Sequence, residues 1–136
     1  MKLSLSKRKS TDESSNSVSE KQIELDILDW LNRQPNTFAW KNETMGIYDP
    51  RTERWRKRSK FAITGIPDIQ GVYLCVNPVV FFMEVKSEDG VASKSQIAFI
   101  NKMTKMKVPV TIVRKLQEAQ RFFQEKVVNY GFHASE

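Results

Sequence analysis

The sequence predicts an α/β sandwich, in which helices pack on a sheet made of a hairpin and a later strand. An amphipathic helical pattern follows Ser19, two apolar β-type runs flank the turn at residues 77–78, and a helix–strand–helix pattern fills residues 93–131. Such an alternation is typical of helices layered on a small sheet. With 136 residues the chain is long enough to bury one core, so a single domain is expected.

The first helix is expected to run from Glu20 to about Arg33. Ser19 and Gln22 have the spacing of a capping box, and Pro35 follows the last turn. At 3.6 residues per turn, one face of this helix is an apolar stripe that consists of Ile23, Ile27, Trp30 and Leu31.

Two acids, Glu20 and Glu24, fall within this apolar stripe, one turn apart. A carboxylate that points into a core is unfavourable unless it is paired or binds a metal. An acid in the first turn can also be solvated and favoured by the helix dipole, which is a sufficient structural role for Glu20. The residues alone leave open which of the two acids serves a site.

The central feature of the chain is a predicted β-hairpin around residues 77–78. Side chains two residues apart on a strand face the same way, so Glu84 and Lys86 point to one side while Val85 points to the other. Asp68 stands at the start of the first run, and folding of the hairpin brings it back beside Glu84 and Lys86.

Two carboxylates and an ammonium at one end of a sheet fit metal-assisted hydrolysis of a phosphodiester. Close carboxylates disfavour each other's ionisation unless a cation lies between them, and oxygen ligands suit Mg²⁺. A neighbouring lysine can position the attacking water or offset charge on a phosphate. Each residue alone also fits a simpler role, Asp68 as a turn residue after Pro67 and Glu84 with Lys86 as a solvated strand end.

The composition narrows the function classes. The net charge of +6 and pI near 9.5 favour a polyanionic partner, with nucleic acid ahead of an anionic membrane. No apolar run reaches the roughly 20 residues that span a bilayer, and no signal peptide is visible, so a cytoplasmic protein without a membrane partner is expected. One cysteine and one histidine argue against disulfide, cysteine-zinc, Ser-His and Cys-His chemistry. Residues 1–18 are Ser-rich and charged and predict a disordered arm, and residues 133–136 form a short tail.

A basic loop insertion is expected at residues 43–60, after a short strand at residues 37–42. Tyr48 and Trp55 are interleaved with its basic residues, which favours a surface that follows a nucleic-acid backbone and stacks on bases. The alternative is a surface loop whose Trp55 packs onto the core. The candidate nucleic-acid-binding residues are Arg51, Arg54, Arg56, Lys57, Arg58 and Lys60 of this loop, and Lys94 at the start of the next helix.

That next helix begins at Ser93. Ser93 and Gln96 again have capping-box spacing, so Gln96 has a sufficient structural role at the helix start. The side chains expected to point inward are Ile97, Ile100, Met103 and Thr104.

The chain is then expected to form a strand at residues 108–113 and a last helix that stops at Gly131. The apolar residues that repeat at helical spacing in this helix are Leu116, Ala119, Phe123 and Val127. They predict a core helix or a dimer surface rather than a site.

The motifs together resemble the VRR-NUC branch of the PD-(D/E)XK nuclease superfamily, a Holliday-junction-resolvase-like group. The resemblance covers about residues 19–115, and its motifs are Glu20-Lys-Gln-Ile23, Gly65-Ile-Pro-Asp68, Met83-Glu-Val-Lys86 and Ser93-x-x-Gln96. It implies the restriction-endonuclease-like core, a small mixed sheet flanked by helices in the order α-β-β-β-α-β-α. The domain is expected to span residues 19–132.

The resemblance also implies roles for particular residues. Asp68 and Glu84, with the carbonyl of Val85, are expected to ligate Mg²⁺, with Mn²⁺ as a substitute. Glu20 is the helix acid that the family pattern selects to support the metal. Lys86 is expected to activate the attacking water, and the family keeps a glutamine at the position of Gln96 that reaches the active site.

The expected function is therefore a metal-dependent endonuclease that hydrolyses DNA. Relatives of this size suggest action on branched DNA such as Holliday junctions by a homodimer with paired active sites. Residues 41–60 contain no motif that aligns with the family, so substrate preference stays open. The alternatives are a non-catalytic nucleic-acid-binding module on the same fold and a sequence-specific, restriction-type endonuclease.

Overall fold

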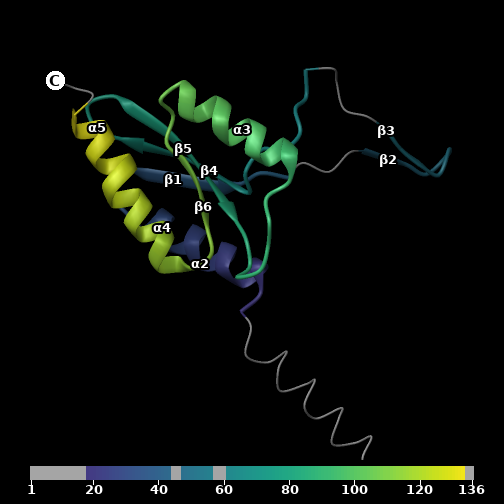
Figure 1. The fold of residues 1–136 in the computed structure, drawn as a ribbon, viewed down its shortest axis with the longest axis horizontal. Coiled ribbons are helices and arrows are strands. Elements are labelled where there is room, and N and C mark those ends of the chain that lie inside the picture. Colours follow the sequence, from purple (N-terminus) through teal and green to yellow (C-terminus); the bar gives the residue numbers. More distant parts are fainter. Residues whose placement is uncertain (1–17, 44–46, 57–60, 134–136) are drawn as a thin grey trace, which may run out of the picture.

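The computed structural model describes residues 18–43, 47–56 and 61–133 (Figure 1). The expected arm, except Val18, and the expected tail, except His133, lie outside these residues. The elements are α2 (Glu20–Arg33), β1 (Thr37–Lys41), β2 (Ile47–Asp49), β3 (Arg54–Arg56), β4 (Ile69–Leu74), β5 (Pro78–Val85), α3 (Lys94–Lys105), β6 (Val110–Val113), α4 (Leu116–Phe122), the π-helix η1 (Phe123–Val128) and α5 (Asn129–His133).

The centre of the protein is a four-stranded mixed sheet with strand order β1-β4-β5-β6. β1 pairs with β4 and β4 with β5 in antiparallel fashion, whereas β5 and β6 are parallel. Because a parallel connection needs a long crossover, α3 lies between β5 and β6 in the chain. The α/β class with a mixed sheet is confirmed. The four sheet strands and the first three described helices come in the order α2, β1, β4, β5, α3, β6 and α4, with the β2–β3 hairpin inserted between β1 and β4.

Helices pack on both faces of the sheet. Alternate side chains of β5 point to the face that carries the main core, which consists of Ile23, Ile27, Leu31, Ala39, Ile69, Val79, Phe81, Met83, Val85, Val113, Ala119, Phe122, Phe123 and Val127. α2 and the α4–η1 helix supply the helical residues of this cluster. On the opposite face, Phe82 of β5 meets Phe99 of α3 edge to face, with ring centroids 5.1 Å apart.

The first helix has the predicted bounds and half of the predicted capping box, since the side-chain amide of Gln22 donates to Asp26 at 2.9 Å. The Ser19 hydroxyl accepts a hydrogen bond from the backbone N–H of Gln22, at 3.2 Å. Of the two acids in the stripe, Glu24 is buried, with 7% of its surface exposed, whereas Glu20 is exposed. The apolar stripe therefore includes one acid and not the other.

The inward face of α3 differs from the prediction. Ile97 is 46% exposed and Thr104 is also exposed, so the prediction that they point inward is wrong. Ile100 and Met103 are half-buried as expected. The inward row of half-buried residues is Gln96, Phe99, Ile100 and Met103. The helix is thus rotated toward its glutamine, because Phe99 packs on the sheet.

The last helix continues past Gly131, where a stop was predicted. A Cβ atom at this position would lie 3.1 Å from Cγ2 of Val79 and 3.2 Å from Cβ of Cys75. Glycine here allows close packing on the sheet instead of ending the helix. Ala119, Phe123 and Val127 are buried, so this helix belongs to the core. No helix in the part of the chain that the structure describes is both long and apolar enough to cross a membrane.

The segment expected as a basic loop contains a second, two-stranded sheet. β2 and β3 pair antiparallel, with Tyr48 opposite Trp55. Trp55 is 59% exposed, so the alternative prediction, in which its side chain packs onto the core, is wrong. Figure 1 shows this hairpin standing away from the main sheet and its helices.

Candidate active site

Asp68 and Glu84 lie side by side at one end of the central sheet. Ile69 pairs with Met83 in the β4–β5 ladder, which places the preceding Asp68 at the level of Glu84. Oδ2 of Asp68 accepts a hydrogen bond from the backbone N–H of Val85, at 3.0 Å. The hairpin therefore brings the two acids together, as the strand period predicted. The N–H of Val85 donates to Asp68, whereas the role of the Val85 carbonyl as a metal ligand stays a prediction.

Lys86 completes this cluster. Its Nζ lies 3.5 Å from Oε1 of Glu84, and its side chain is 15% exposed. The backbone N–H of Lys86 donates to the carbonyl of Val113 at 3.0 Å, so β6 fixes the backbone that carries the ammonium. A lysine that is mostly covered and close to a buried carboxylate is well placed to act within a site rather than in bulk solvent.

The electrostatics of Glu84 are unusual for a glutamate. Burial, followed by the neighbouring Asp68 carboxylate, raises the pKa of Glu84 to about 7, and Lys86 offsets part of this effect. Oε2 of Glu84 is buried without a hydrogen-bond partner, and among the residues that the structure describes no other side-chain atom is in this position. An unpartnered buried oxygen beside a second carboxylate fits a hard cation such as Mg²⁺.

Gln96 has both of the roles that its sequence position allowed. Its backbone N–H donates to the Ser93 hydroxyl at 3.2 Å, and its Oε1 accepts from the N–H of Ser93 at 2.8 Å, which forms the predicted capping box. Its Nε2 donates to Oε1 of Glu84 at 3.0 Å. The amide oxygen of Gln96 thus binds the helix cap while its amide nitrogen binds Glu84. The cap therefore orients the amide that holds Glu84.

Glu20 contacts the backbone beside the cluster, while its predicted support of a metal stays a prediction. Its Oε1 accepts a hydrogen bond from the backbone N–H of Ser87 at 2.9 Å, so it holds the segment that follows Lys86. Within residues 18–43, 47–56 and 61–133, no group of three or more His, Cys, Asp and Glu side chains could hold a metal. The geometry thus offers the carboxylates of Asp68 and Glu84, and Glu20 acts on the backbone next to them.

Two residues near Asp68 were missed as site residues in the sequence. Lys41, at the end of β1, lies with its Nζ 3.1 Å from Oε1 of the buried Glu24. The hydrogen bond and charge of Glu24 raise the pKa of Lys41, with weaker contributions from Glu43 and Asp68. The N–H of Asn42 donates to the carbonyl of Asp68 at 2.7 Å. The position of Glu24 within the apolar stripe was a signal that this acid needs a partner, but nothing in the neighbouring sequence identified Lys41 as that partner.

The predicted nucleic-acid-binding residues are only partly described. Arg51 and Arg54 are exposed on the β2–β3 hairpin, and Lys94 is exposed at the first position of α3. The Arg51 guanidinium is paired loosely with Asp49, with 3.7 Å between Nε and Oδ1. Arg56 lies within β3, and Lys57, Arg58 and Lys60 lie outside the described residues.

A groove of about 920 Å³ lies beyond the segment that Glu20 holds. Ser87, Asp26 and Arg114 are among its lining residues, whereas Asp68, Glu84 and Lys86 are not. The Arg114 guanidinium donates to the carbonyls of Ser87 and Gly90 at 2.6 and 2.7 Å, which uses it to brace the backbone. This groove is therefore separate from the carboxylate cluster.

Comparisons of the chain with protein-family models, with curated protein sequences and with solved structures gave no match. What the fold and site define is an α/β protein with two adjacent carboxylates, a lysine and a glutamine at one end of a mixed sheet.

Proposed function

We propose that the protein is a metal-dependent nuclease of the PD-(D/E)XK type, in its VRR-NUC branch, that hydrolyses phosphodiester bonds of DNA. The observation that carries the proposal is the cluster of Asp68, Glu84 and Lys86, in which a buried oxygen of Glu84 has no partner. Two adjacent carboxylates, of which Glu84 is buried and Asp68 half-buried, disfavour each other's ionisation, and a cation between them relieves this effect. The overall charge of +6 favours a polyanionic substrate.

Asp68 and Glu84, with the carbonyl of Val85, would hold Mg²⁺, and Mn²⁺ would substitute. The cation, when bound, supplies charge stabilisation for the scissile phosphate and the leaving oxygen. Asp68 is held in place by the N–H of Val85, and Gln96 orients the carboxylate of Glu84. This positioning is the role that the contacts favour for Gln96, ahead of direct placement of water or substrate.

Lys86 orients the attacking water and offsets negative charge on the phosphate. Its ammonium is already within reach of Glu84, so the water that it holds lies beside the carboxylates. Glu20 supports the site from the side, because its bond to the N–H of Ser87 fixes the backbone immediately after Lys86. Lys41 adds a second positive charge close to Asp68.

The substrate that we propose is branched DNA, such as a Holliday junction, cut by a homodimer. A junction presents paired strands, and two-fold symmetry supplies paired active sites. Sedimentation of the protein with and without a four-way junction tests the dimer. A monomer on the junction would contradict this part of the proposal and leave the chemistry untouched.

The decisive experiment is a cleavage assay on labelled linear, nicked and four-way-junction DNA with Mg²⁺ and, separately, Mn²⁺. Wild-type protein is expected to cut branched DNA, and Lys86→Ala to lower the rate by about 10²- to 10⁴-fold, the usual contribution of a group that activates water. Lys102→Ala is the matched control, since Lys102 is an exposed lysine in the last turn of α3.

Other outcomes would replace the proposal. Binding of all three DNAs by wild-type protein without cleavage in either metal would favour the non-catalytic module. Discrete fragments from long linear duplex would favour a restriction-type enzyme.

A further inference from the structure

The β2–β3 hairpin presents two aromatic side chains to solvent. Tyr48 and Trp55 lie directly opposite each other, with ring centroids 5.4 Å apart and ring planes at 58°. They are 48% and 59% exposed. A two-stranded hairpin is marginally stable in water, and a cross-strand aromatic pair adds some stability to it. Neither ring is buried, so each retains a large apolar surface for a ligand.

The residues around this aromatic pair are charged, with the exposed Arg51 and Arg54 beside two acids, Asp49 and Glu53. Side chains of paired residues share a face, so Tyr48 and Trp55 occupy one face while the next pair, Asp49 and Arg54, occupies the other. Arg51 lies in the turn between the strands and is exposed, as is Arg54. A hairpin with an aromatic pair on one face, Arg54 on the other face and Arg51 in the turn matches a ligand that is both anionic and flat-faced and that passes over the hairpin.

Both ends of the segment that carries the hairpin are fixed beside the carboxylate cluster. On the leading side, the N–H of Asn42 donates to the carbonyl of Asp68 at 2.7 Å, and its side-chain amide donates to the carbonyl of Pro67 at 3.2 Å.

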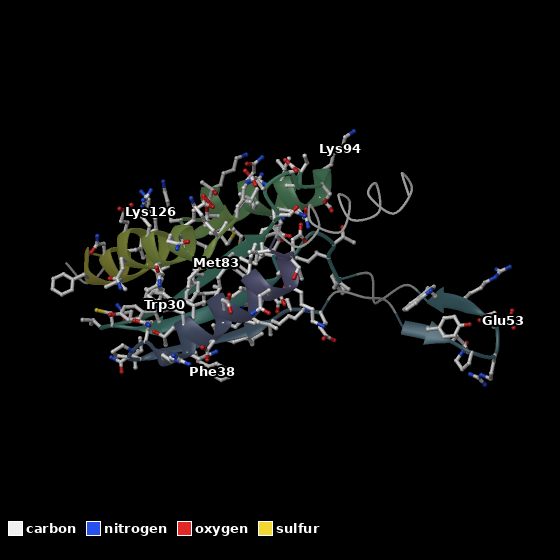
Figure 2. The ribbon with its side chains drawn as sticks, turned by 90° about the horizontal axis from the view of Figure 1, so that it is seen from below. Trp30, Phe38, Glu53, Met83, Lys94 and Lys126 are labelled. Atoms are coloured by element: carbon white, nitrogen blue, oxygen red, sulfur yellow. The ribbon has the colours of Figure 1, made fainter. Side chains whose placement is uncertain are left out.

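On the returning side, Gly65 has φ +82° and lies against the first turn of α3. A Cβ at Gly65 would lie 2.3 Å from the carbonyl oxygen of Ser95 and 2.7 Å from the N–H nitrogen of Gln96. Only glycine allows this approach. In Figure 2, Lys94 marks the end of α3 on the hairpin's side, and Glu53 marks the hairpin tip. The segment that carries the hairpin is therefore anchored at one end next to Asp68 and at the other next to Gln96, which contacts Glu84.

We propose that the β2–β3 hairpin binds unpaired bases of a DNA strand by stacking on Tyr48 and Trp55, with Arg51 and Arg54 on its phosphates. In a duplex each base face is covered by its neighbours, whereas at a fork or branch point some faces are open. The inference rests on the proposed nuclease function and specifies its substrate. The preferred DNA has unpaired bases next to the bond that is cut.

The test measures binding and is independent of cleavage. Lys86→Ala protein is titrated onto fluorescein-labelled oligothymidylate, a fork with single-stranded arms, and a blunt duplex, and anisotropy is recorded. When Tyr48→Ala and Trp55→Ala are introduced into this Lys86→Ala protein, binding of oligothymidylate and of the fork is expected to weaken by about 10- to 100-fold, the range for loss of base stacking. Binding of the blunt duplex is expected to weaken by less than about 2-fold. Phe38→Ala is the matched control, because Phe38 is a 65% exposed aromatic residue on β1, outside the hairpin.

A second variant separates stacking from hydrophobic contact. Tyr48→Leu with Trp55→Leu keeps apolar area but removes the aromatic faces, and it is expected to lose the preference for unpaired bases as fully as the alanine variant does. Each variant should unfold at the same melting temperature as the wild-type protein, which verifies that its core is intact.

Three results would overturn the hairpin proposal: unchanged binding in the alanine variant, an equal loss on all three DNAs, or a loss of self-association without any change in DNA binding. The last result would identify a second copy of the chain as the occupant. If wild-type protein cuts no DNA but the variant still loses only the unpaired-base preference, the nuclease proposal fails while the stacking surface stands.

Discussion

The carboxylate cluster and the β2–β3 hairpin are built in opposite ways. Glu84 is 1% exposed and is contacted by the side chains of Lys86, directly after β5, and Gln96 of α3. Trp55 is 59% exposed, and its ring partner is Tyr48 of a three-residue strand. A group that takes part in chemistry must be held in one geometry, and the core of this protein supplies that support. A group that binds a mobile strand must be accessible. Substitutions in the two regions should therefore change different properties, and the following predictions test that separation.

The largest effect is expected for Asp68→Asn. The amide keeps the size of the side chain but removes the charge beside Glu84, so cleavage should fall by about 10²- to 10⁴-fold while binding of forked DNA stays within about 2-fold. Gel-based single-turnover assays and anisotropy measure the two quantities. Asp26→Asn, on the exposed side of α2, is the control and should cut like wild type. A parallel loss of cleavage and binding would mean that the two regions are not separable.

The free energy of unfolding should also distinguish the core around the carboxylate cluster from the β2–β3 hairpin. Phe81 is fully buried, meets Phe123 at 5.8 Å between ring centroids, and covers Gly71. Phe81→Ala is expected to lower the free energy of unfolding by about 3–5 kcal/mol, because it opens a cavity. Trp55→Ala should change it by less than about 0.5 kcal/mol. Urea denaturation measures both. A large loss for Trp55→Ala would show that the hairpin is part of the core after all.

The acid pair should give the folded protein a particular pH dependence. Burial raises the pKa of Glu84 from 4.5 to about 7, so between these values the folded state binds more protons than the unfolded state. The contribution of Glu84 to stability is then fully present below about pH 4.5 and is lost as the pH rises through about 7.

Melting temperatures of wild type and Glu84→Gln, compared from pH 4.5 to 8 without metal, measure this contribution. The glutamine variant should lack the decline. Adding Mg²⁺ at pH 8 should raise the melting temperature of wild type and not that of the variant. Identical curves for the two proteins would contradict the raised pKa of Glu84.

The smallest effect is expected at the cap of α3. Ser93→Ala removes the hydroxyl that accepts from Gln96 and should cost about 1 kcal/mol of stability. The bond from the Ser93 N–H to Oε1 of Gln96 survives, so cleavage should fall less than in Gln96→Leu, which also releases Glu84. Thr104→Ala is the control, since its hydroxyl donates to the carbonyl of Ile100 within the same helix, away from the cap. Equal cleavage by Gln96→Leu and wild type would remove Gln96 from the site.

The elements that local patterns specify were the ones predicted well. The bounds of α2 follow from the Ser19 cap, the apolar stripe and Pro35, all within one segment. The meeting of Asp68 with Glu84 follows from the strand period once a hairpin is assumed. The inward face of α3 was assigned wrongly because its inward row includes a polar residue, Gln96, that apolar periodicity ignores.

The β2–β3 hairpin escaped prediction for a different reason. Its strands are three residues long, too short for an alternating pattern to stand out from a charged segment. The pairing of Tyr48 with Trp55 depends on the register of the two strands, which composition does not reveal.

The sequence by itself determined the α/β class, the helix starts at Ser19 and Ser93, and the acid–base cluster at the end of the hairpin. These depend on caps, periodicities and turns that act over a few residues. Only the tertiary structure decided that Glu20 binds the N–H of Ser87, 67 residues away, and that Glu24 pairs with Lys41. Which partner a side chain meets across such a distance depends on how the layers pack, and close packing is a property of the whole core.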